Sequence, residues 1–540
     1  MKKINRISAQ LASFLKPLKN FKNLKLLKIP TILTIIFALS SCSDYLDVRP
    51  ENQILLDDFW QKGSDVEAVV LACYRAMQED AFMYRLITWG ELRSDNVIAA
   101  GSAGDAEKQI NNVNILATNG NCSWASFYMV INYCNLVLKY APVVVERDPN
   151  FTESDRQAKE AEVLAIRSLC YFYLVRTFRD VPLVLEATIS DDQVLFVPQS
   201  SPEEVLKKIT EDLLQAETWA MSSYATPRDT KGRITKDAIR AILADVYLWK
   251  QEYTACIDYC DKLINATTTL GFAGTTVERP KYELIEDDLF SFDIFDNGNA
   301  SESIFELQFS SEKWNAAVYD FYGHSGTIGQ MTTTALYAEG ETLYKTADMR
   351  KVDYIRFPKS DGGEYPIFKY MGSRMGENAY LYKATTANWI FYRITDVMLM
   401  KAEALVQLNR SETDLKEALH IVNTTYVRAN PSQLEGDTIK YEENANAVSM
   451  EKLVLLERQR ELIFEGKRWF DLVRHSERKN STGELVDYVM TKYTANQSTI
   501  RSKLSVMNAL YLPIHADELK VNPLLKQNPY YQTSSTIEKN

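Results

Sequence analysis

The sequence predicts a mainly α-helical protein, in which about four tetratricopeptide-like helical hairpins form a scaffold and an irregular, loop-rich region carries short β segments. Two observations predict the helices. Apolar residues recur at the spacing of a 3.6-residue helical turn, and the segments with this spacing follow one another in pairs. The third observation is that the periodicity disappears over residues 271–388, where Gly, Thr, Asp and aromatic residues accumulate.

A leader precedes this helical body. Residues 1–41 contain seven Lys, one Arg and no acidic residue, and they include an apolar run from Ile32 to Leu39. The run is well short of the ~20 apolar residues that span a bilayer, which disfavours an uncleaved transmembrane anchor. Small serines precede Cys42, as a lipoprotein signal peptidase needs. We therefore predict a signal peptide over residues 1–41 and lipidation of Cys42, since several acyl chains on one cysteine anchor a protein durably.

The predicted mature chain is strongly acidic. The whole chain has 61 basic and 72 acidic residues, and removal of eight basic leader residues leaves 53 against 72, a net charge of −19. Phosphate binding needs clustered Lys and Arg, so neither nucleic acid nor anionic lipid headgroups are expected as partners. Thirty Tyr, 22 Phe and 8 Trp supply aromatic side chains mostly for the core and partly for a binding face.

The remaining cysteines are expected to be buried thiols. They are Cys73, Cys122, Cys134, Cys170, Cys256 and Cys260. Most of them fall in apolar-periodic segments, where a free thiol packs as a small hydrophobic group, so thiols are favoured over the disulfides that export would allow. Cys256 and Cys260 are four residues apart, but no His or second Cys pair is near them in sequence. A zinc site is therefore not expected.

Four helices are expected in the N-terminal part. Their ranges are 65–78, 124–145, 154–178 and 202–221. Ser154 is the N-cap candidate of the third helix, and Pro182 follows its end because proline cannot continue a helix. Pro202 begins the fourth helix, where its missing amide is harmless and the glutamates that follow complement the helix dipole.

Two helical hairpins predict the repeat architecture. Their paired helices span residues 232–249 with 254–264 and residues 392–405 with 413–428. In the first hairpin, small Ala241 and Ala244 let a neighbouring helix approach closely, and Tyr247 and Leu248 fill the space beyond. Stacked hairpins bury faces that a single hairpin leaves exposed, so about four hairpins are expected.

The irregular stretch separates the two repeat-rich parts and contains β-like runs such as residues 303–309. An irregular region of this length inside a compact protein is usually functional, so we place the ligand surface there. The alternative is a solvated insertion in the scaffold that has no role in ligand binding. The expected parts of the mature chain are a helical part (42–270), the irregular region (271–390) and a C-terminal helical part (391–540).

A charged segment at residues 457–474, interpreted as one helix with a break at Gly466, bears on catalysis. Glu461 and Glu465 lie on one helical face, as the paired carboxylates of a glycoside hydrolase would. However, Arg and Lys residues surround them at helical spacings, which favours ion pairs and keeps the carboxylates ionised. The sequence also has no nucleophile elbow, P-loop, dinucleotide fingerprint or zinc-protease motif. Neither enzymatic activity nor a cofactor is expected.

A cluster of acidic and amide residues could supply oxygen ligands to a structural Ca²⁺. The cluster is Asp287, Asp288, Asp293, Asp296, Asn297 and Asn299. Phe295 occupies the third position of any EF-hand alignment, which breaks the pattern. A solvated acidic turn is the favoured interpretation, and no metal site is predicted.

Five groups of residues together resemble the SusD/RagB family. They are Cys42-Ser43-Asp44-Tyr45-Leu46-Asp47, Glu91-Leu92-Arg93-Ser94-Asp95-Asn96, the hairpin from Gly232, the charged segment 457–474, and the C-terminal motifs Tyr511-Leu512-Pro513-Ile514 and Gln527-Asn528-Pro529-Tyr530. They cover essentially the whole mature chain in the family's order. The resemblance implies a cell-surface lipoprotein of the outer membrane that binds nutrients, mostly oligosaccharides and sometimes peptides, without catalysis.

The resemblance also implies a partner. Proteins of this family sit as a lid on a SusC-like TonB-dependent barrel, with the tetratricopeptide-like helices against the barrel and the ligand among loops on the opposite face. The residue patterns agree with this division, since regular helices suit a partner and irregular aromatic loops suit a ligand. A peptide-binding receptor, or a helical-repeat assembly scaffold of the outer membrane, is the alternative.

The candidate ligand residues follow from sugar chemistry. Sugar rings have apolar C–H faces that stack on aromatic planes, and their hydroxyls need carboxylate or amide partners. The first candidates cluster in the irregular region and are Trp314, Asn315, Tyr319, Asp320 and Tyr322. A second loop element, similar to early loops that contribute to ligand sites in the family, consists of Trp89, Arg93, Asp95 and Asn96. For each residue the alternative is a structural role, in the core or in capping a turn.

Overall fold

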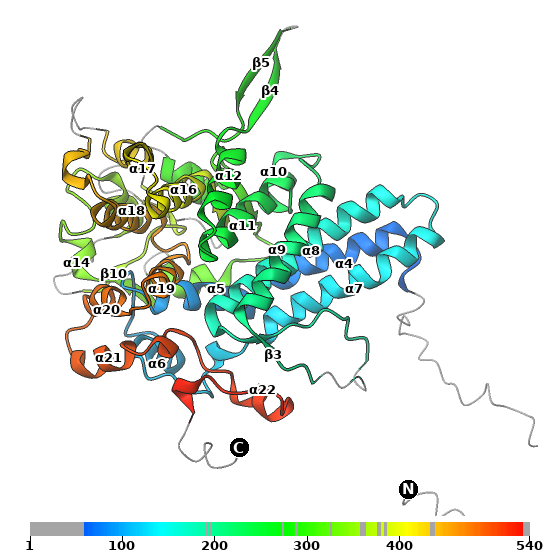
Figure 1. Ribbon diagram of the computed structural model, residues 1–540, viewed down its shortest axis with the longest axis horizontal. Coiled ribbons are helices and arrows are strands. Elements are labelled where there is room, and N and C mark those ends of the chain that lie inside the picture. Colours follow the sequence, from blue (N-terminus) through cyan, green and yellow to red (C-terminus); the bar gives the residue numbers. More distant parts are fainter. Residues whose placement is uncertain are drawn as a thin grey trace, which may run out of the picture. The chain divides into compact units, whose positions relative to one another are not determined.

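Paired helices packed side by side make up most of the computed structural model of this protein (Figure 1). The structure describes residues 59–190, 193, 196–272, 275–286, 290–324, 327–356, 363–374, 380–382, 386–431 and 438–532. Residues 60–540 group into one unit, and the predicted part boundaries at 270 and 390 stay predictions within it. The predicted signal peptide and Cys42 lie outside the described residues.

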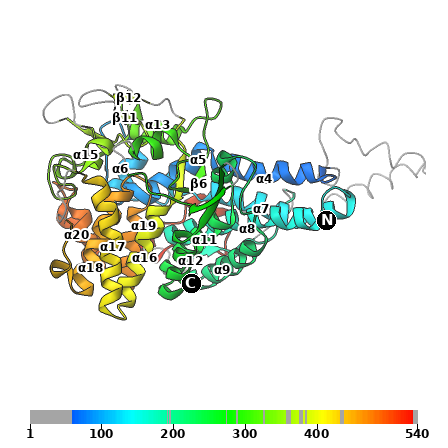
Figure 2. The same cartoon turned by 90° about the horizontal axis from the view of Figure 1, so that it is seen from above.

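Long helices in the N-terminal part pack in a row. The helices of this part are α4 (Gly63–Met77), α5 (Asp80–Ile87), α6 (Asp105–Asn111), α7 (Ala125–Arg147), α8 (Glu153–Phe178), α9 (Pro202–Trp219) and α10 (Pro227–Gly232). Helix α7 packs against both α4 and α8, and α8 packs against α9 (Figure 2). The four helices predicted here are confirmed, each with its ends within two residues of the expected ones.

Side-chain caps set the first residues of α8 and α9. Thr152, rather than the expected Ser154, caps α8: its hydroxyl accepts from the amide of Asp155 at 3.2 Å, and the Asp155 carboxylate accepts from the amide of Thr152 at 2.9 Å. Ser201 and Glu204 form the same reciprocal pair at α9, with Pro202 as its first residue. Each cap pairs backbone amides that the first helical turn leaves without a partner.

The second row of helices begins with α11. The remaining helices are α11 (Lys236–Trp249), α12 (Tyr253–Ile264), α13 (Ala316–Tyr322), α14 (Ala335–Ala338), α15 (Met349–Tyr354), α16 (Ile394–Leu408), α17 (Glu412–Ala429), α18 (Ala447–Leu462), α19 (Arg468–Lys479), α20 (Gly483–Met490), α21 (Gln497–Leu504) and α22 (Ala516–Val521). Helix α12 packs against α11 and α16, and α16 packs against α17 and α18. Both predicted hairpins are confirmed, and Ala241 and Ala244 are fully buried as their small size predicts.

The charged segment 457–474 is two helices, not one. Helix α18 ends at Leu462 and α19 begins at Arg468, because the intervening backbone is left-handed at Phe464 (φ +66°) and at Gly466 (φ +72°). The turn at Gly466 brings its backbone against that of Gly90: a Cβ atom on Gly90 would lie 2.0 Å from the Gly466 carbonyl oxygen. The expected break at Gly466 therefore lies in the turn between the two helices and permits a close backbone approach.

Short strands occur mainly in the irregular region. They are β1 (Ile98–Ala99), β2 (Val181–Pro182), β3 (Gln199–Ser200), β4 (Thr267–Phe272), β5 (Thr275–Pro280), β6 (Ser303–Leu307), β7 (Gly323–His324), β8 (Thr327–Ile328), β9 (Met331–Thr333), β10 (Tyr365–Pro366), β11 (Gly372–Arg374), β12 (Tyr380–Tyr382) and β13 (Trp389–Arg393). The predicted β run at 303–309 is confirmed as β6, which pairs antiparallel with β13. Strand β9 lies between β1 and β10, and the β4–β5 hairpin projects from the helices (Figure 1).

Shorter helical turns complete the chain. They are η2 (Thr88–Leu92), η3 (Gly120–Cys122), η4 (Phe292–Asn297), η5 (Glu442–Asn444), η6 (Met507–Leu510) and η7 (Pro529–Tyr531). Among the described ranges, one stretch, Gly120–Arg147, is long and apolar enough to cross a membrane by length and composition. Helix α7 forms most of it and packs against α4 and α8, as a core helix does.

The six cysteines of the helical body are free and buried, as predicted. The Sγ atoms of Cys73 and Cys134 lie 3.8 Å apart, which is van der Waals contact rather than a disulfide. Cys256 and Cys260 are both buried in α12. Each thiol therefore fills core volume in its helix.

Candidate ligand-binding site

The contact between α5 and α13 assembles an aromatic surface from segments more than 200 residues apart in sequence. Tyr84 of α5 packs on Phe321 of α13, with ring centroids 5.0 Å apart, and its hydroxyl donates a hydrogen bond to the Asp320 carboxylate. Burial and the neighbouring Asp320 carboxylate raise the pKa of Tyr84, which therefore stays a neutral donor. One carboxylate and one phenol, both partly exposed, are thus held together at α13.

Trp314 is the most exposed aromatic side chain of this surface. Its exposed fraction is 55%, although its indole N–H donates to the carbonyl oxygen of Ser311 at 2.9 Å. The hydrogen bond fixes the polar edge of the ring within its own turn and leaves ring surface open to solvent. A fixed, open aromatic plane suits stacking against an apolar ligand face.

A second flat surface lies at the C-terminal end of α13. The Tyr319 ring stacks on the His324 imidazole at a centroid distance of 4.2 Å and an interplanar angle of 8°. Gly323, the first residue of β7, makes this possible, because its φ of +102° turns the chain sharply after α13. Both rings are partly exposed. The sequence interpretation missed His324, and its position five residues after Tyr319 was the signal available.

Ion pairs border this surface on one side. The Lys313 ammonium lies 3.4 Å from the Glu79 carboxylate and 3.7 Å from that of Asp80, at the start of α5. These acidic groups are well exposed, so each pair contributes little to stability. Lys313 and Tyr84 are further residues of the surface that sequence patterns did not identify, since both depend on the long-range packing of α5 against α13.

Asn315 and Tyr322 are structural rather than surface residues, which corrects the expectation that they contact a ligand. The Asn315 amide caps α13 by accepting from the amide of Val318 at 3.2 Å and donates to the carbonyl of Ala387 at 2.9 Å. The Tyr322 hydroxyl donates to the carbonyl of Phe464 at 2.7 Å. Both side chains are almost completely buried. Of the five candidates from this segment, Trp314, Tyr319 and Asp320 remain on the surface.

Trp89 and Arg93 are also interior residues, contrary to their expected place in the ligand site. The Trp89 indole donates to the carbonyl of Asn121 at 2.7 Å and stacks on Phe127 at 4.8 Å. The Arg93 guanidinium lies over the Trp469 ring and donates to two backbone carbonyls of η6, each at 2.5 Å. Trp89 thus packs within the N-terminal part, and Arg93 joins that part to C-terminal segments. Sequence spacing reveals neither role.

Asp95 and Asn96 are likewise fully buried. The Asp95 carboxylate accepts two hydrogen bonds from the Arg468 guanidinium, at 2.8 and 3.0 Å, and one from the Tyr337 hydroxyl at 2.8 Å. Although burial opposes ionisation, Arg468 prevails and the pKa of Asp95 is lowered. Asn96 donates to Glu91 at 3.0 Å and accepts from Gln459 at 2.9 Å. This loop holds the charged segment in place instead of facing solvent.

The paired carboxylates of the charged segment are enclosed by cations, but these cations come from distant parts of the chain and not, as predicted, from the segment itself. Glu461 accepts from Arg393 at 2.6 Å and from Arg350 at 3.1 Å, and it also pairs with Arg428. Glu465 accepts from Arg393 at 2.7 Å and from Lys369 at 2.6 Å. Burial opposes ionisation of both, but the cations hold the pKa of each carboxylate below its usual value. Groups in this state do not act as general acids.

The acidic turn considered for Ca²⁺ belongs in part to η4. Asp293 accepts a hydrogen bond from the Asn297 amide at 2.8 Å within that turn, and Asn299 donates its backbone amide to Glu306. Asp287 and Asp288 lie outside the described residues. Among the residues that the structure describes, no group of three or more His, Cys, Asp or Glu side chains is placed to hold a metal ion.

Comparison with known proteins agrees with the resemblance found in the motifs. The model of the family described as "SusD family" matches residues 301–531, and that described as "Starch-binding associating with outer membrane" matches residues 44–248. SusD-like protein P38 of Formosa agariphila is 27% identical over 476 residues, which cover 81% of this chain and 88% of that protein. SusD-like protein P25 of the same organism is 24% identical and covers 91% of this chain and 96% of its own.

Solved structures share the fold. A SusD superfamily protein from Bacteroides vulgatus superposes with a TM-score of 0.69 at 21% identity, covering 87% of this chain and all of the other. A SusD homolog from Bacteroides thetaiotaomicron gives a TM-score of 0.66 at 22% identity over 88% of this chain and all of its own. Motifs, two family models and a shared helical fold lead to one assignment: the chain belongs to the SusD/RagB family of glycan-binding proteins that associate with the outer membrane.

Proposed function

We propose that this protein captures oligosaccharides at the cell surface and passes them to a SusC-like TonB-dependent transporter, without catalysing a reaction. The main support for glycan binding is the surface formed by α5 and α13. There the exposed Trp314 ring and the Tyr319–His324 stack offer aromatic planes, and Asp320 offers a carboxylate. Aromatic planes match the apolar faces of sugar rings, and a carboxylate accepts hydroxyl protons.

The proposed ligand surface is preorganised. Trp314 is hydrogen-bonded within its turn, Tyr319 is stacked on His324, and Asp320 receives the Tyr84 hydroxyl. Preorganisation lowers the entropy cost of ligand binding, because the side chains lose little further freedom. An aromatic surface of this kind accepts several sugars and leaves the identity of the glycan to the surrounding residues.

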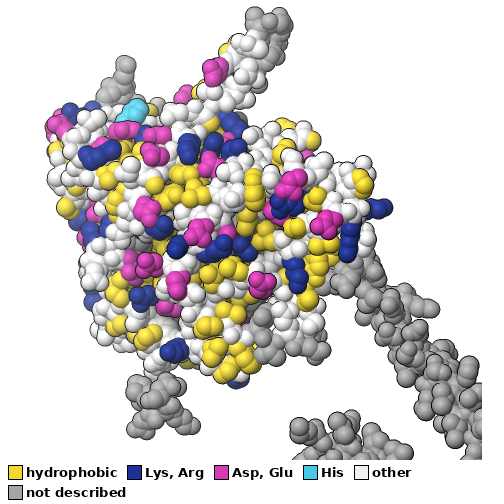
Figure 3. All heavy atoms as spheres, turned by 45° about the vertical axis from the view of Figure 1, so that its right-hand side comes forward, with side chains coloured by type: hydrophobic (Ala, Val, Ile, Leu, Met, Phe, Trp, Pro, Cys, Tyr) yellow, Lys and Arg dark blue, Asp and Glu magenta, His cyan; other side chains and the backbone are white. Residues whose placement is uncertain are grey.

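For the transporter, we propose the outer surface of the helical rows as the contact. Figure 3 shows hydrophobic side chains gathered in patches between charged ones on one face of the molecule. Exposed apolar residues occur on three N-terminal helices, with Leu71 on α4, Met129 on α7 and Leu214 on α9. Apolar patches rimmed by polar residues are typical of protein interaction sites.

We further propose that lipid on Cys42 anchors the protein to the outer membrane, so that it stays beside the transporter when the ligand is released. Cys42→Ser is expected to move the protein from the membrane fraction to the soluble fraction. Substitution of the buried Cys73 by Ser is the matched control and should leave the protein in the membrane fraction. Retention of the Cys42→Ser variant in the membrane would contradict lipid anchoring.

A glycan panel tests the binding role. The full chain, solubilised in detergent, is titrated with neutral and acidic oligosaccharides and with oligopeptides of similar length. Binding of at least one oligosaccharide is the expected result. Binding of oligopeptides alone would replace the glycan role with a peptide-receptor role, and recovery of the protein as a lone species after gentle extraction from membranes would count against the transporter partnership.

A further inference from the structure

Asp320 places a carboxylate without a cationic partner on the α5–α13 surface. Its side chain is partly exposed, and its Oδ2 atom accepts the hydrogen bond from the Tyr84 hydroxyl. Among the described residues, no Lys, Arg or His side chain forms an ion pair with Asp320, and no donor is bonded to its Oδ1 atom. The phenol of Tyr84 is a neutral donor, so it leaves the negative charge of Asp320 uncompensated.

The cations at the start of α5 pair with other carboxylates. The Lys313 ammonium lies 3.4 Å from the Glu79 carboxylate and 3.7 Å from that of Asp80, and the Arg75 guanidinium lies 3.5 Å from Glu79. Two cations and two anions therefore balance each other there. The charge of Asp320 is additional to this balanced group.

The electrostatic field at the Tyr84 hydroxyl is negative. Burial raises the pKa of Tyr84, and the carboxylates of Asp320, Asp80 and Glu107 raise it further. Arg85, the next residue of α5, donates from all three of its guanidinium nitrogens to backbone carbonyls. The whole chain is also acidic, with 72 acidic residues against 61 basic ones. The local field and the overall charge therefore both favour a cationic group at this surface.

The aromatic rings of the surface favour the same kind of charge. Tyr319 is partly exposed and stacks on His324 at a centroid distance of 4.2 Å, and Trp314 is 55% exposed. The faces of tyrosine and tryptophan rings attract ammonium groups, and they also stack on the apolar faces of sugars. A ligand that has both sugar rings and an ammonium group would use both properties.

We infer that the α5–α13 surface selects glycans that contain an amino sugar with a free ammonium group, which binds the Asp320 carboxylate while neighbouring sugar units stack on the aromatic planes. This selectivity rests on the proposed glycan-binding function and specifies its substrate class. The ammonium of an amino sugar is attached directly to a rigid ring, whereas a lysine ammonium ends a flexible chain and loses more freedom on binding. Carboxylated and sulfated sugars are disfavoured, because the surface carboxylates repel them.

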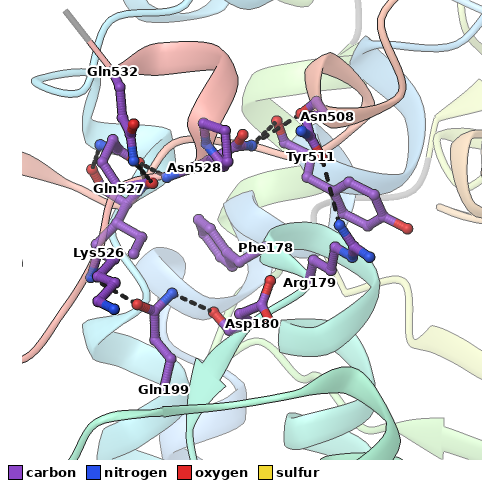
Figure 4. Close-up of a pocket in the computed structure, with 12 residues that line it drawn as sticks. Phe178, Arg179, Asp180, Gln199, Asn508, Tyr511, Lys526, Gln527, Asn528 and Gln532 are labelled. Carbon is purple, nitrogen blue, oxygen red and sulfur yellow. Dashed lines mark hydrogen bonds between the residues drawn. The ribbon is translucent and has the colours of Figure 1, made fainter. Parts of the chain in front are cut away.

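Asp180 is a matched control carboxylate elsewhere in the chain. It lines a pocket of about 350 Å³ between the end of α8 and the C-terminal segment, which also contains the Phe178 ring (Figure 4). Like Asp320, it is partly exposed and has an aromatic residue near it. However, the same pocket contains the cations Arg179 and Lys526, which oppose the binding of an ammonium group.

Calorimetric titration of the full chain in detergent with three tetrasaccharides tests the selectivity. The three share one backbone and differ only in the substituent beside the anomeric carbon, which is a hydroxyl in cellotetraose, an acetamide in tetra-N-acetylchitotetraose and an ammonium in chitotetraose. At a pH where the amine is protonated, chitotetraose should bind about fivefold or more tightly than either neutral tetramer. Added salt should reduce this preference, because the Asp320 carboxylate is partly exposed.

Substitution of Asp320 separates charge from packing. Asp320→Asn removes the charge, but its amide oxygen can still accept the Tyr84 hydroxyl. The affinity for chitotetraose should fall about fivefold, to that of the neutral tetramers, whose binding should change little. Asp180→Asn should leave all three affinities unchanged, and Trp314→Ala should weaken all three. Melting temperatures verify folding, and the salt dependence of the unsubstituted protein is decisive if Asp320→Asn does not fold.

Three results would overturn the selectivity. They are equal affinities for chitotetraose and the neutral tetramers, no binding of chitotetraose, and a preference that survives Asp320→Asn. Tetralysine that binds as tightly as chitotetraose, and loses affinity in Asp320→Asn, would replace the amino sugar with a cationic peptide. Trp314-dependent binding of the neutral tetramers without a preference removes the selectivity and leaves the proposed function intact. Absence of oligosaccharide binding across the whole glycan panel removes the proposed function itself.

Discussion

The close approach of Gly90 and Gly466 gives a sharp stability prediction. In Gly90→Ala, the new Cβ would lie 2.0, 2.5 and 2.8 Å from the carbonyl oxygen, carbonyl carbon and Cα of Gly466. All three are backbone atoms, so no side-chain rotation relieves the overlap, and the two segments must separate. Separation also weakens the 2.8 Å hydrogen bond from the Gly466 amide to the buried Glu91 carboxylate.

The magnitude follows from these two losses. Overpacking a filled core costs about 1–3 kcal/mol, and loss of a buried hydrogen bond to a charged or polar acceptor adds about 1.5–3 kcal/mol. Gly90→Ala should therefore lower the free energy of unfolding by about 2.5–6 kcal/mol. The matched control is Gly120→Ala, because no atom lies within 4 Å of its added Cβ, and a change within about 0.5 kcal/mol is expected.

Denaturant unfolding followed by tryptophan fluorescence measures both variants against the unsubstituted protein. The expected result is a clear drop in the transition midpoint for Gly90→Ala and none for Gly120→Ala, with similar slopes. If Gly90→Ala unfolds within about 0.5 kcal/mol of the unsubstituted protein, the close packing of η2 against the α18–α19 turn is refuted.

Three further predictions concern the interior. Glu461→Gln removes a buried anion from between arginines and should lower the free energy of unfolding by about 3–5 kcal/mol. The control Glu412→Gln, in an exposed ion pair, should lower it by less than about 1 kcal/mol. Equal effects of the two substitutions would contradict the buried network. Burial raises the pKa of Glu91 from 4.5 to about 7, so the folded protein keeps a proton that the unfolded chain releases in this range. The free energy of unfolding should thus fall by about 3 kcal/mol as the pH rises from about 4.5 to about 7. An equally steep fall in the Glu91→Gln variant would show that Glu91 is not the group responsible. The buried cysteines should resist thiol reagents, measured by mass spectrometry, until denaturant is added, and rapid labelling in the folded state would show that they are accessible.

The helical scaffold was predictable because its signals are local. Periodic apolar residues, the capping groups at Pro202 and the small residues of α11 each act within one or two helical turns, and the helices that they predict are present. The same locality explains the misplaced N-cap at Ser154, since Thr152 offers equivalent chemistry two residues earlier and reciprocates with Asp155. Local patterns fix a helix better than they fix its first residue.

The candidate site was less predictable because it depends on long-range packing. Asp95 looks like an exposed polar turn in the sequence, but its partner Arg468 lies 373 residues away and draws it into the interior. Trp314, in contrast, is exposed as expected, while Asn315 beside it is buried. Long-range contacts thus decide which of two neighbouring polar or aromatic residues lies on the surface and which lies in the core. The spacing of residues in the sequence does not predict these contacts.

The most direct test of the glycan-binding role is calorimetric titration of an oligosaccharide that the panel identifies, using Trp314→Ala and Phe196→Ala. Phe196 is the matched control, with an exposed fraction of 48% against 55% for Trp314. Removal of a stacking ring of this size should weaken binding about tenfold or more in Trp314→Ala, and Phe196→Ala should bind as the unsubstituted protein does. Unchanged affinity in Trp314→Ala would contradict the placement of the ligand on the α5–α13 surface.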